Sequence, residues 1–185
     1  INFLHGMFKP AVNIEDIQNN PASDMLLKIK GDARKLRDTF SESELKLIFN
    51  SPVLQFAKYP YQFWVTVLSL FTGARREELC NLYCEDIKRE DGVWYIDISA
   101  NKPDKRIKTY QIRTIPLHLF VIELGFIKYV KTFKKGQRIW PELNNNNRDK
   151  KYGHYYGRWF NNNLLKPLDI KPTKDELKAG AARKD

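Results

Sequence analysis

The stretch YQFWVTVLSLFTGARREEL, residues 61–79, decides how the rest of the sequence is interpreted. Residues 61–71 are apolar at almost every position, which predicts a helix that is buried nearly all round. The Thr-Gly pair that follows breaks this helix, and a second helix is expected to restart from Ala74. Arg75 and Arg76 then lie at a helix N-terminus, which carries partial positive charge and favours Asp or Glu. A local rule broken in this way marks a candidate functional site.

The composition is that of a globular, basic protein. The 185 residues are enough for one domain with a core, or for most of one. Lysine and arginine total 32 against 22 acids, a net charge of +10 that suits nucleic acid or an anionic membrane surface. No apolar run is long enough to cross a bilayer and no signal-peptide pattern is present, so we expect a cytoplasmic protein.

The two cysteines, Cys80 and Cys84, are four residues apart on what is predicted to be one helix. Two ligands do not make a zinc site, which needs four, and no second Cys or His pair lies at suitable spacing. We therefore expect no metal centre, and buried thiols in a reducing compartment.

The chain is expected to divide into three parts. Residues 1–20 are predicted to be the end of a preceding helical domain, residues 21–37 a polar linker and residues 38–185 the main domain. Ser41 and Glu44 have the spacing of a capping box, which predicts that a helix starts after Ser41. The first residue is an Ile rather than a Met, so we expect a segment of a longer protein.

Beyond residue 83 the apolar pattern changes to period two, which predicts β-strands. The segments CEDIKRE and VWYIDIS flank an Asp-Gly turn signal and are expected to form a hairpin. A basic loop, NKPDKRIKTY, leads to a third strand in IRTIPL. Past Leu117 the sequence predicts two helices separated by Gly125, the second ending in KYVKTFKKGQR. A loop of four asparagines and a last helix near YYGRWFNNNLL follow. The expected fold class is α+β, mainly helical with a small three-stranded antiparallel sheet.

These features resemble the first half of the catalytic domain of the tyrosine recombinases, the family that includes the phage integrases. The similarity covers about residues 40–170. It consists of a buried helix, a T-G-x-R-x-x-E-L box, an Asp-Ile at the next strand and R-x-[IV]-P-L after a basic hairpin loop. The residues that match are Thr72, Gly73, Arg75, Glu78, Leu79, Leu82, Asp86, Ile87, Arg113, Ile115, Pro116 and Leu117. Residues 1–20 are similar to the last helix of the DNA-clamping domain that precedes such catalytic domains.

The resemblance implies a site-specific recombinase that breaks and rejoins double-stranded DNA through a 3′-phosphotyrosyl intermediate, without a metal or nucleotide cofactor. It assigns to Arg75 the stabilisation of negative charge that develops on the phosphate oxygens in the transition state. Glu78, one turn on, is expected to orient the Arg75 guanidinium. Without the motif, the two residues would be interpreted as a surface ion pair worth about 0.3 kcal/mol.

The basic hairpin loop is expected to carry the second catalytic residue. Lys102, its first lysine, matches the position of the family's general acid, which protonates the leaving 5′-oxygen. Lys105 is the alternative, because the loop is long and contains several cations. For the stretch from Lys128 to Arg138, a solvated helix face and a duplex-facing edge both remain open. The candidate DNA contacts are Arg76, Lys105, Arg106, Lys108 and Arg158, and most of the loop cations are expected to contact phosphates irrespective of sequence.

The family's second box, H-x-x-R, has no match in the 185 residues. The pentapeptide HYYGR, from His154 to Arg158, has a spacing one residue too long, and His154 is expected to be structural or to contact a phosphate. Tyr155 and Tyr156 are poor candidates for the nucleophile and are expected to be core aromatics. We therefore expect a catalytic domain truncated before its second box, which cannot cleave DNA by itself.

Other functions stay open at this point. A non-catalytic DNA-binding or interaction module on the same scaffold is the main alternative to the recombinase, and a degenerate, inactive protein is a weaker one. An RNA-binding domain is weaker still, because the aromatic strand signatures of common RNA modules are missing. Full-length members of the family self-assemble on paired DNA sites.

Overall fold

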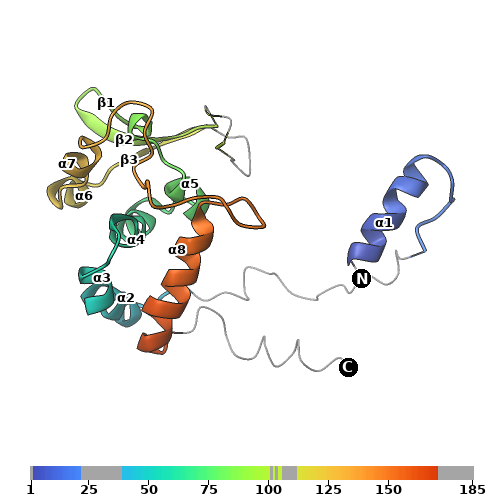
Figure 1. Ribbon diagram of the computed structural model, residues 1–185, viewed down its shortest axis with the longest axis horizontal. Helices are drawn as coiled ribbons and strands as arrows, with labels where there is room; N and C mark the ends of the chain where they lie inside the picture. Colours follow the sequence, from blue (N-terminus) through green and yellow to red (C-terminus); the bar gives the residue numbers. More distant parts are fainter. Residues whose placement is uncertain (1, 22–38, 101, 103, 106–111, 171–185) are drawn as a thin grey trace. The chain divides into compact units, whose positions relative to one another are not determined.

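The computed structural model describes residues 2–21, 39–100, 102, 104–105 and 112–170. The chain forms two compact units, one of residues 1–38 with 173–185 and one of residues 39–172. In the first unit, α1 (Asn2–Asn13) is the helix that the structure describes (Figure 1). The helix expected over residues 1–20 is therefore present, but it ends at Asn13, and turns follow it.

The second unit begins with three helices: α2 (Glu42–Asn50), α3 (Pro52–Gln55) and α4 (Pro60–Thr72). The predicted capping box of α2 is confirmed. The Glu44 N–H donates to Ser41 Oγ at 3.3 Å, and the Ser41 N–H donates to Glu44 Oε2 at 2.7 Å. The predicted buried helix is also confirmed as α4, whose Val65 and Leu68 are fully buried.

The next short helix, α5 (Arg76–Cys80), starts two residues later than expected and is followed by a 3-10 turn, η2 (Cys84–Asp86). The prediction that both cysteines share one helix is wrong, because α5 stops at Cys80 with Asn81 as its C-cap. Cys80 is buried and Cys84 is half-buried, and both thiols are free. No group of three or more metal-ligating side chains occurs in the described part of the chain.

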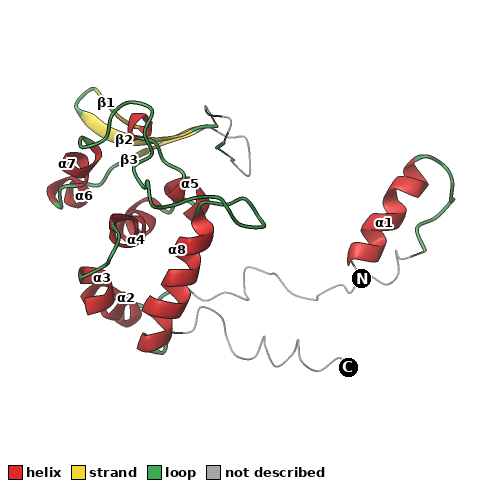
Figure 2. Cartoon of the chain, viewed as in Figure 1, coloured by secondary structure: helices red, strands yellow, loops and turns green. Residues whose placement is uncertain are grey.

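The predicted three-stranded antiparallel sheet is confirmed (Figure 2). Its strands are β1 (Ile87–Glu90), β2 (Val93–Ile98) and β3 (Arg113–Pro116), in that spatial order. Ile96 faces Ile87 on one side and Ile115 on the other, so one face of the sheet carries an aliphatic row toward the core.

After the sheet come α6 (Leu119–Glu123) and α7 (Phe126–Val130), separated by Gly125 as expected. Because α7 ends at Val130, the basic residues from Lys131 to Arg138 lie outside the helix that was expected to hold them. The last described helix is α8 (Gly153–Trp159), which continues as a π-helical segment, η3 (Phe160–Leu165), and a 3-10 turn, η4 (Lys166–Leu168).

The main hydrophobic core joins α4, α5, the sheet and α7, and a smaller one joins α2, α3 and the π-helical segment. Trp140 is fully buried in the main core, and its indole N–H donates to the Leu79 carbonyl at 2.7 Å. This bond connects α5 to the segment that follows α7. No helix in the described ranges has the length and apolar character of a membrane span.

Candidate functional site

A buried carboxylate, Glu78, organises the candidate site. Its side chain is 3% exposed, and its two oxygens accept hydrogen bonds from two arginines. Arg75 donates its backbone N–H to Oε2 at 2.8 Å and Nη1–H to Oε1 at 3.1 Å. Arg113 donates Nη2–H to Oε2 at 2.7 Å and Nη1–H to Oε1 at 3.2 Å. Helix α5 and strand β3 thus meet at a single acid.

The local backbone explains this arrangement. Gly73 ends α4 in the left-handed region (φ 59°), which turns the chain sharply before α5. Arg75 is then the N-cap of α5 with extended backbone, and Glu78 reaches back to its N–H as in a capping box. The acid that the helix start favours is therefore supplied by Glu78, which compensates for the arginine at the cap.

The charge state of Glu78 follows from its contacts. Burial favours the neutral acid, but the hydrogen bonds from Arg113 and Arg75 outweigh burial and hold the Glu78 pKa below its usual value. The side chains of Arg75 and Arg113 remain 47% and 36% exposed. Two guanidinium groups thus contact a single carboxylate.

Lys102 lies on the loop between β2 and β3. Its ammonium pairs with Glu85 at 2.7 Å and lies 4.9 Å from the centre of the Tyr83 ring. The hydrogen bond to Glu85 raises the Lys102 pKa, so the side chain is cationic at neutral pH. Lys102 is about one-third exposed, so solvent and a ligand can reach it.

Lys105, in contrast, is an interior residue. Its side chain is 3% exposed and pairs with the fully buried Asp86 at 2.5 Å, which also accepts the Tyr83 N–H at 2.7 Å. The expectation that Lys105 contacts DNA phosphates disagrees with this placement, because its ammonium does not lie at the surface. Between the two lysines weighed as the general acid, Lys102 is the accessible one.

Sequence reasoning missed a cluster that anchors the loop between β2 and β3. The Arg138 guanidinium stacks between the rings of Tyr83 and Tyr152, at 4.5 and 3.7 Å from their centres, and bonds to Asp104. Asp104 Oδ2 also accepts from the hydroxyls of Tyr83 (2.7 Å) and Tyr152 (3.3 Å). We call these four residues the loop anchor. Burial raises the Asp104 pKa, but the hydrogen bonds from Tyr83 and Arg138 outweigh burial and lower the pKa overall.

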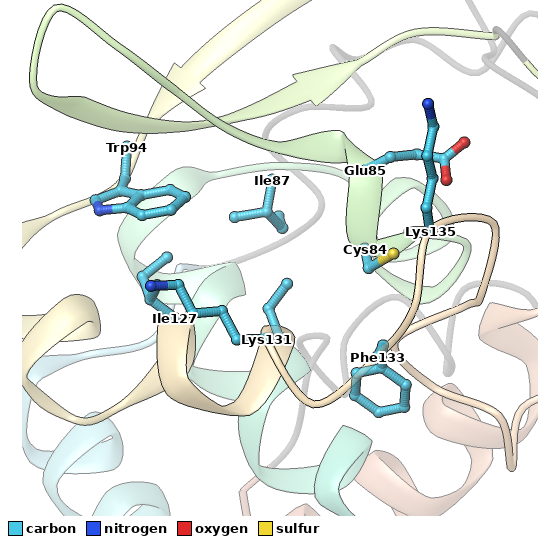
Figure 3. A pocket seen from close by; sticks show the side chains of 9 residues that line it. Cys84, Glu85, Ile87, Trp94, Ile127, Lys131, Phe133 and Lys135 are labelled. Carbon is cyan, nitrogen blue, oxygen red and sulfur yellow. The ribbon is translucent and has the colours of Figure 1, made fainter.

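A small cavity of about 230 Å³ lies between the β1–β2 hairpin and α7 (Figure 3). Ile87 and Trp94 line it from the sheet, and Lys131 and Lys135 line its other side. Lys135 acts electrostatically on Glu85, the partner of Lys102. Lys131 and Lys135, both exposed, therefore lie near the Lys102–Glu85 pair.

The remaining candidates lie elsewhere. Arg76 lies against α8, where Gly153 and Gly157 leave room for its side chain. Arg158 and His154 are exposed on α8. Tyr156 is buried as expected, whereas Tyr155 is 37% exposed and not a core residue. Arg106 and Lys108 lie outside the described residues.

Comparisons with known proteins do not identify a relative. No family model, no curated protein and no solved structure matches this chain.

Proposed function

We propose that this chain carries the arginine-bearing half of the active site of a tyrosine recombinase, an enzyme that breaks and rejoins DNA. The observation that carries the proposal is the Arg75–Glu78–Arg113 cluster. A buried acid holds two accessible guanidiniums, and one of them belongs to the T-G-x-R-x-x-E-L box. An ordinary surface ion pair differs from this cluster, in which the buried acid is bonded by arginines from two separate elements.

The cluster suits a phosphodiester in its transition state. The pentacoordinate phosphorus places more negative charge on its nonbridging oxygens than the ground state does, so fixed cations lower the barrier. Arg75 is the proposed catalytic cation, since its planar fork can donate to two oxygens and stays charged at working pH. Glu78 is a positioning residue that fixes the direction of this fork.

Lys102 is the proposed general acid. Its raised pKa means that the proton is present before the reaction, and transfer to the leaving 5′-oxygen prevents departure of an alkoxide. The ion pair with Glu85 must open for that transfer, because Glu85 holds the ammonium at 2.7 Å. A DNA phosphate competing for the same ammonium is the proposed trigger.

The nucleophilic tyrosine and the second-box His and Arg have no matching positions in the 185 residues. The proposal therefore assigns binding and charge stabilisation to this chain, and predicts no strand cleavage by these residues alone. Assembly on paired DNA sites belongs to the proposal for a complete recombinase. Cytoplasmic location is part of the same proposal.

The test uses two proteins: the 185-residue chain and the longest product of the reading frame that contains it. A nicked duplex that traps covalent protein–DNA adducts gives the readout. We expect adducts only from a product that includes a second box and a tyrosine, and Arg75→Ala should reduce their rate by at least about a hundredfold. Lys46→Ala is the control, since it removes one charge from an exposed pair on α2.

Either of two results contradicts the proposal: adducts from the 185-residue chain alone, or near-normal cleavage by the Arg75→Ala protein. The alternative is a non-catalytic DNA-binding module on the same scaffold. Both functions predict affinity for duplex DNA that falls with salt, by a log–log slope of about −0.9 per phosphate neutralised. Binding without adducts from any product of the reading frame supports the module.

A further inference from the structure

A second cavity, of about 380 Å³, is lined by residues of α2, α4, α5 and α8, the helices labelled in Figure 1. Most of its wall is apolar and comes from α2 and from the start of η3, with Leu45, Ile48, Phe49 and Phe160 as the main contributors. The proposed recombinase chemistry uses none of these residues. The volume is in the range of pockets that bind small molecules.

One end of this cavity is polar, but its hydroxyl protons are already engaged. The Thr66 hydroxyl donates to the Gln62 carbonyl at 2.6 Å, and the Ser69 hydroxyl donates to the Val65 carbonyl at 2.7 Å. The Tyr156 hydroxyl lies 3.0 Å from Thr66 Oγ1 and must be the donor, because the Thr66 proton is used. The three hydroxyl groups therefore have no proton left to donate to a ligand in this cavity.

A donor is instead provided by the Arg76 guanidinium, which lies against two glycines of α8. A Cβ at Gly157 would lie 2.1 Å from Arg76 Nη1, and a Cβ at Gly153 would lie 3.2 Å from Arg76 Nε. Only glycines allow so close an approach to the helix backbone. The Arg76 side chain is exposed and lies directly against the α8 backbone.

The acid next in the chain, Glu77, lies near Arg76 but forms no ion pair with it in the described structure. Glu77 accepts the N–H groups of Tyr152 and Gly153 at 2.9 and 2.8 Å and so caps the start of α8. Among the residues that the structure describes, no hydrogen bond or ion pair is formed by the Arg76 guanidinium. An exposed cation at the end of an apolar cavity suits an anionic ligand with an apolar body.

We propose that this cavity binds a small amphipathic carboxylate, with the carboxylate on Arg76 and the apolar part between α2 and η3. The fork of a guanidinium matches the two oxygens of a carboxylate, which favours this group over a neutral one. The apolar part replaces water on the aromatic and aliphatic wall. The proposal is independent of the recombinase function.

The probe is octanoate, with octanamide as its uncharged counterpart, and binding is measured by calorimetry and by ¹⁵N–¹H spectra of the 185-residue chain. We expect octanoate to bind at least about tenfold more tightly than octanamide. Its addition should shift the amide signals of Gly153 and Gly157 and the Nε signal of Arg76. Equal affinity for the two probes, or no binding of either, overturns the proposal.

Two variants test the role of Arg76 by different routes. Arg76→Gln removes the charge, whereas Gly157→Ala keeps the charge but displaces Nη1, and Ala is a better helix residue than Gly. Both should weaken octanoate at least about tenfold and leave octanamide unchanged. Arg158→Gln, which removes an exposed charge from the same helix, should change neither.

Retained octanoate affinity in both Arg76→Gln and Gly157→Ala overturns the assignment of the carboxylate to Arg76. A peptide is a different class of ligand. Shifts of the same amide signals by an acidic, apolar peptide, with none from octanoate, also contradict a small-molecule site.

Discussion

Arg113 and Glu78 form a two-point ion pair that joins strand β3 to helix α5, with Nη2–Oε2 at 2.7 Å and Nη1–Oε1 at 3.2 Å. The two residues are 35 positions apart in the chain. The same carboxylate bonds the backbone and side chain of Arg75. The orientation of the proposed catalytic arginine therefore depends on the sheet as well as on its own helix.

The Glu78→Gln substitution tests this dependence. It leaves two guanidiniums without their counter-charge at a position where the acid is 3% exposed. We expect the free energy of unfolding to fall by about 2 kcal/mol, the cost of losing hydrogen bonds to a charged group. Urea unfolding followed by circular dichroism gives the value. Glu42→Gln, in an exposed pair with Lys46, should cost less than about 0.5 kcal/mol. Equal costs for the two variants contradict the central role of Glu78.

The stability that Glu78 contributes should depend on pH. Its folded-state pKa lies below the ordinary 4.5, because the bonds from Arg113 and Arg75 outweigh burial. A lowered pKa contributes stability that is present above 4.5 and is lost as the pH falls through the folded-state value. The difference in unfolding free energy between the native chain and Glu78→Gln should therefore be constant near neutral pH and shrink below 4.5. A difference that grows on acidification contradicts the lowered pKa.

The sequence predicted local features better than long-range ones. The capping box at Ser41, the buried helix α4 and the hairpin around the Asp-Gly turn depend on neighbouring residues, and each is confirmed. The Glu78–Arg113 pair is not readable from spacing, because nothing local indicates that strand β3 brings an arginine to this acid. The motif that contains Arg113 does not by itself mark it as a site residue.

The basic loop shows the same limit for charge. Lys102 and Lys105 are equivalent in composition terms, yet one is accessible and the other pairs with the buried Asp86. The difference arises from tertiary packing, which cannot be predicted from the number of lysines in the loop. Arg138 likewise belonged to a run without acids, and its partner Asp104 comes from a different loop.

The assignment of Lys105 to the interior and Lys102 to the surface predicts that two matched substitutions lower the free energy of unfolding by different amounts. Lys105→Met strands the buried Asp86 carboxylate and should destabilise the chain by about 3 kcal/mol. Lys102→Met breaks a partly exposed pair and should cost less than about 1 kcal/mol. Urea unfolding of both variants measures these costs. In a cleavage-competent product, the Lys102 variant should be the slower enzyme despite its stability. The reverse order of stability would exchange the roles of the two lysines.

The loop anchor predicts a local rather than a global effect. Asp104→Asn weakens the acceptor that serves Arg138, Tyr83 and Tyr152, so the loop should lose its attachment. We expect faster amide hydrogen exchange at residues 104–105, with little change in β1 and β2. Asp91→Asn, an exposed change in the β1–β2 turn, is the control because Asn also tolerates its positive φ of 46°. Unchanged exchange in the Asp104 variant contradicts the anchor.

Gly73 offers a test of how the backbone positions Arg75. Its φ of 59° lies in the left-handed region, and a Cβ there would meet no atom within 4 Å. The cost of Gly73→Ala is therefore conformational rather than steric, about 1 kcal/mol. Gly73→Asn should cost less, because Asn occupies this region more readily than Ala. Thermal and urea unfolding rank the two variants.

If the chain instead relaxes by turning residue 73 out of this region, Arg75 moves away from Glu78. The Arg75 side-chain signals should then shift in Gly73→Ala and stay in place in Gly73→Asn. Equal stability and unchanged signals in both variants would show that the turn does not position Arg75.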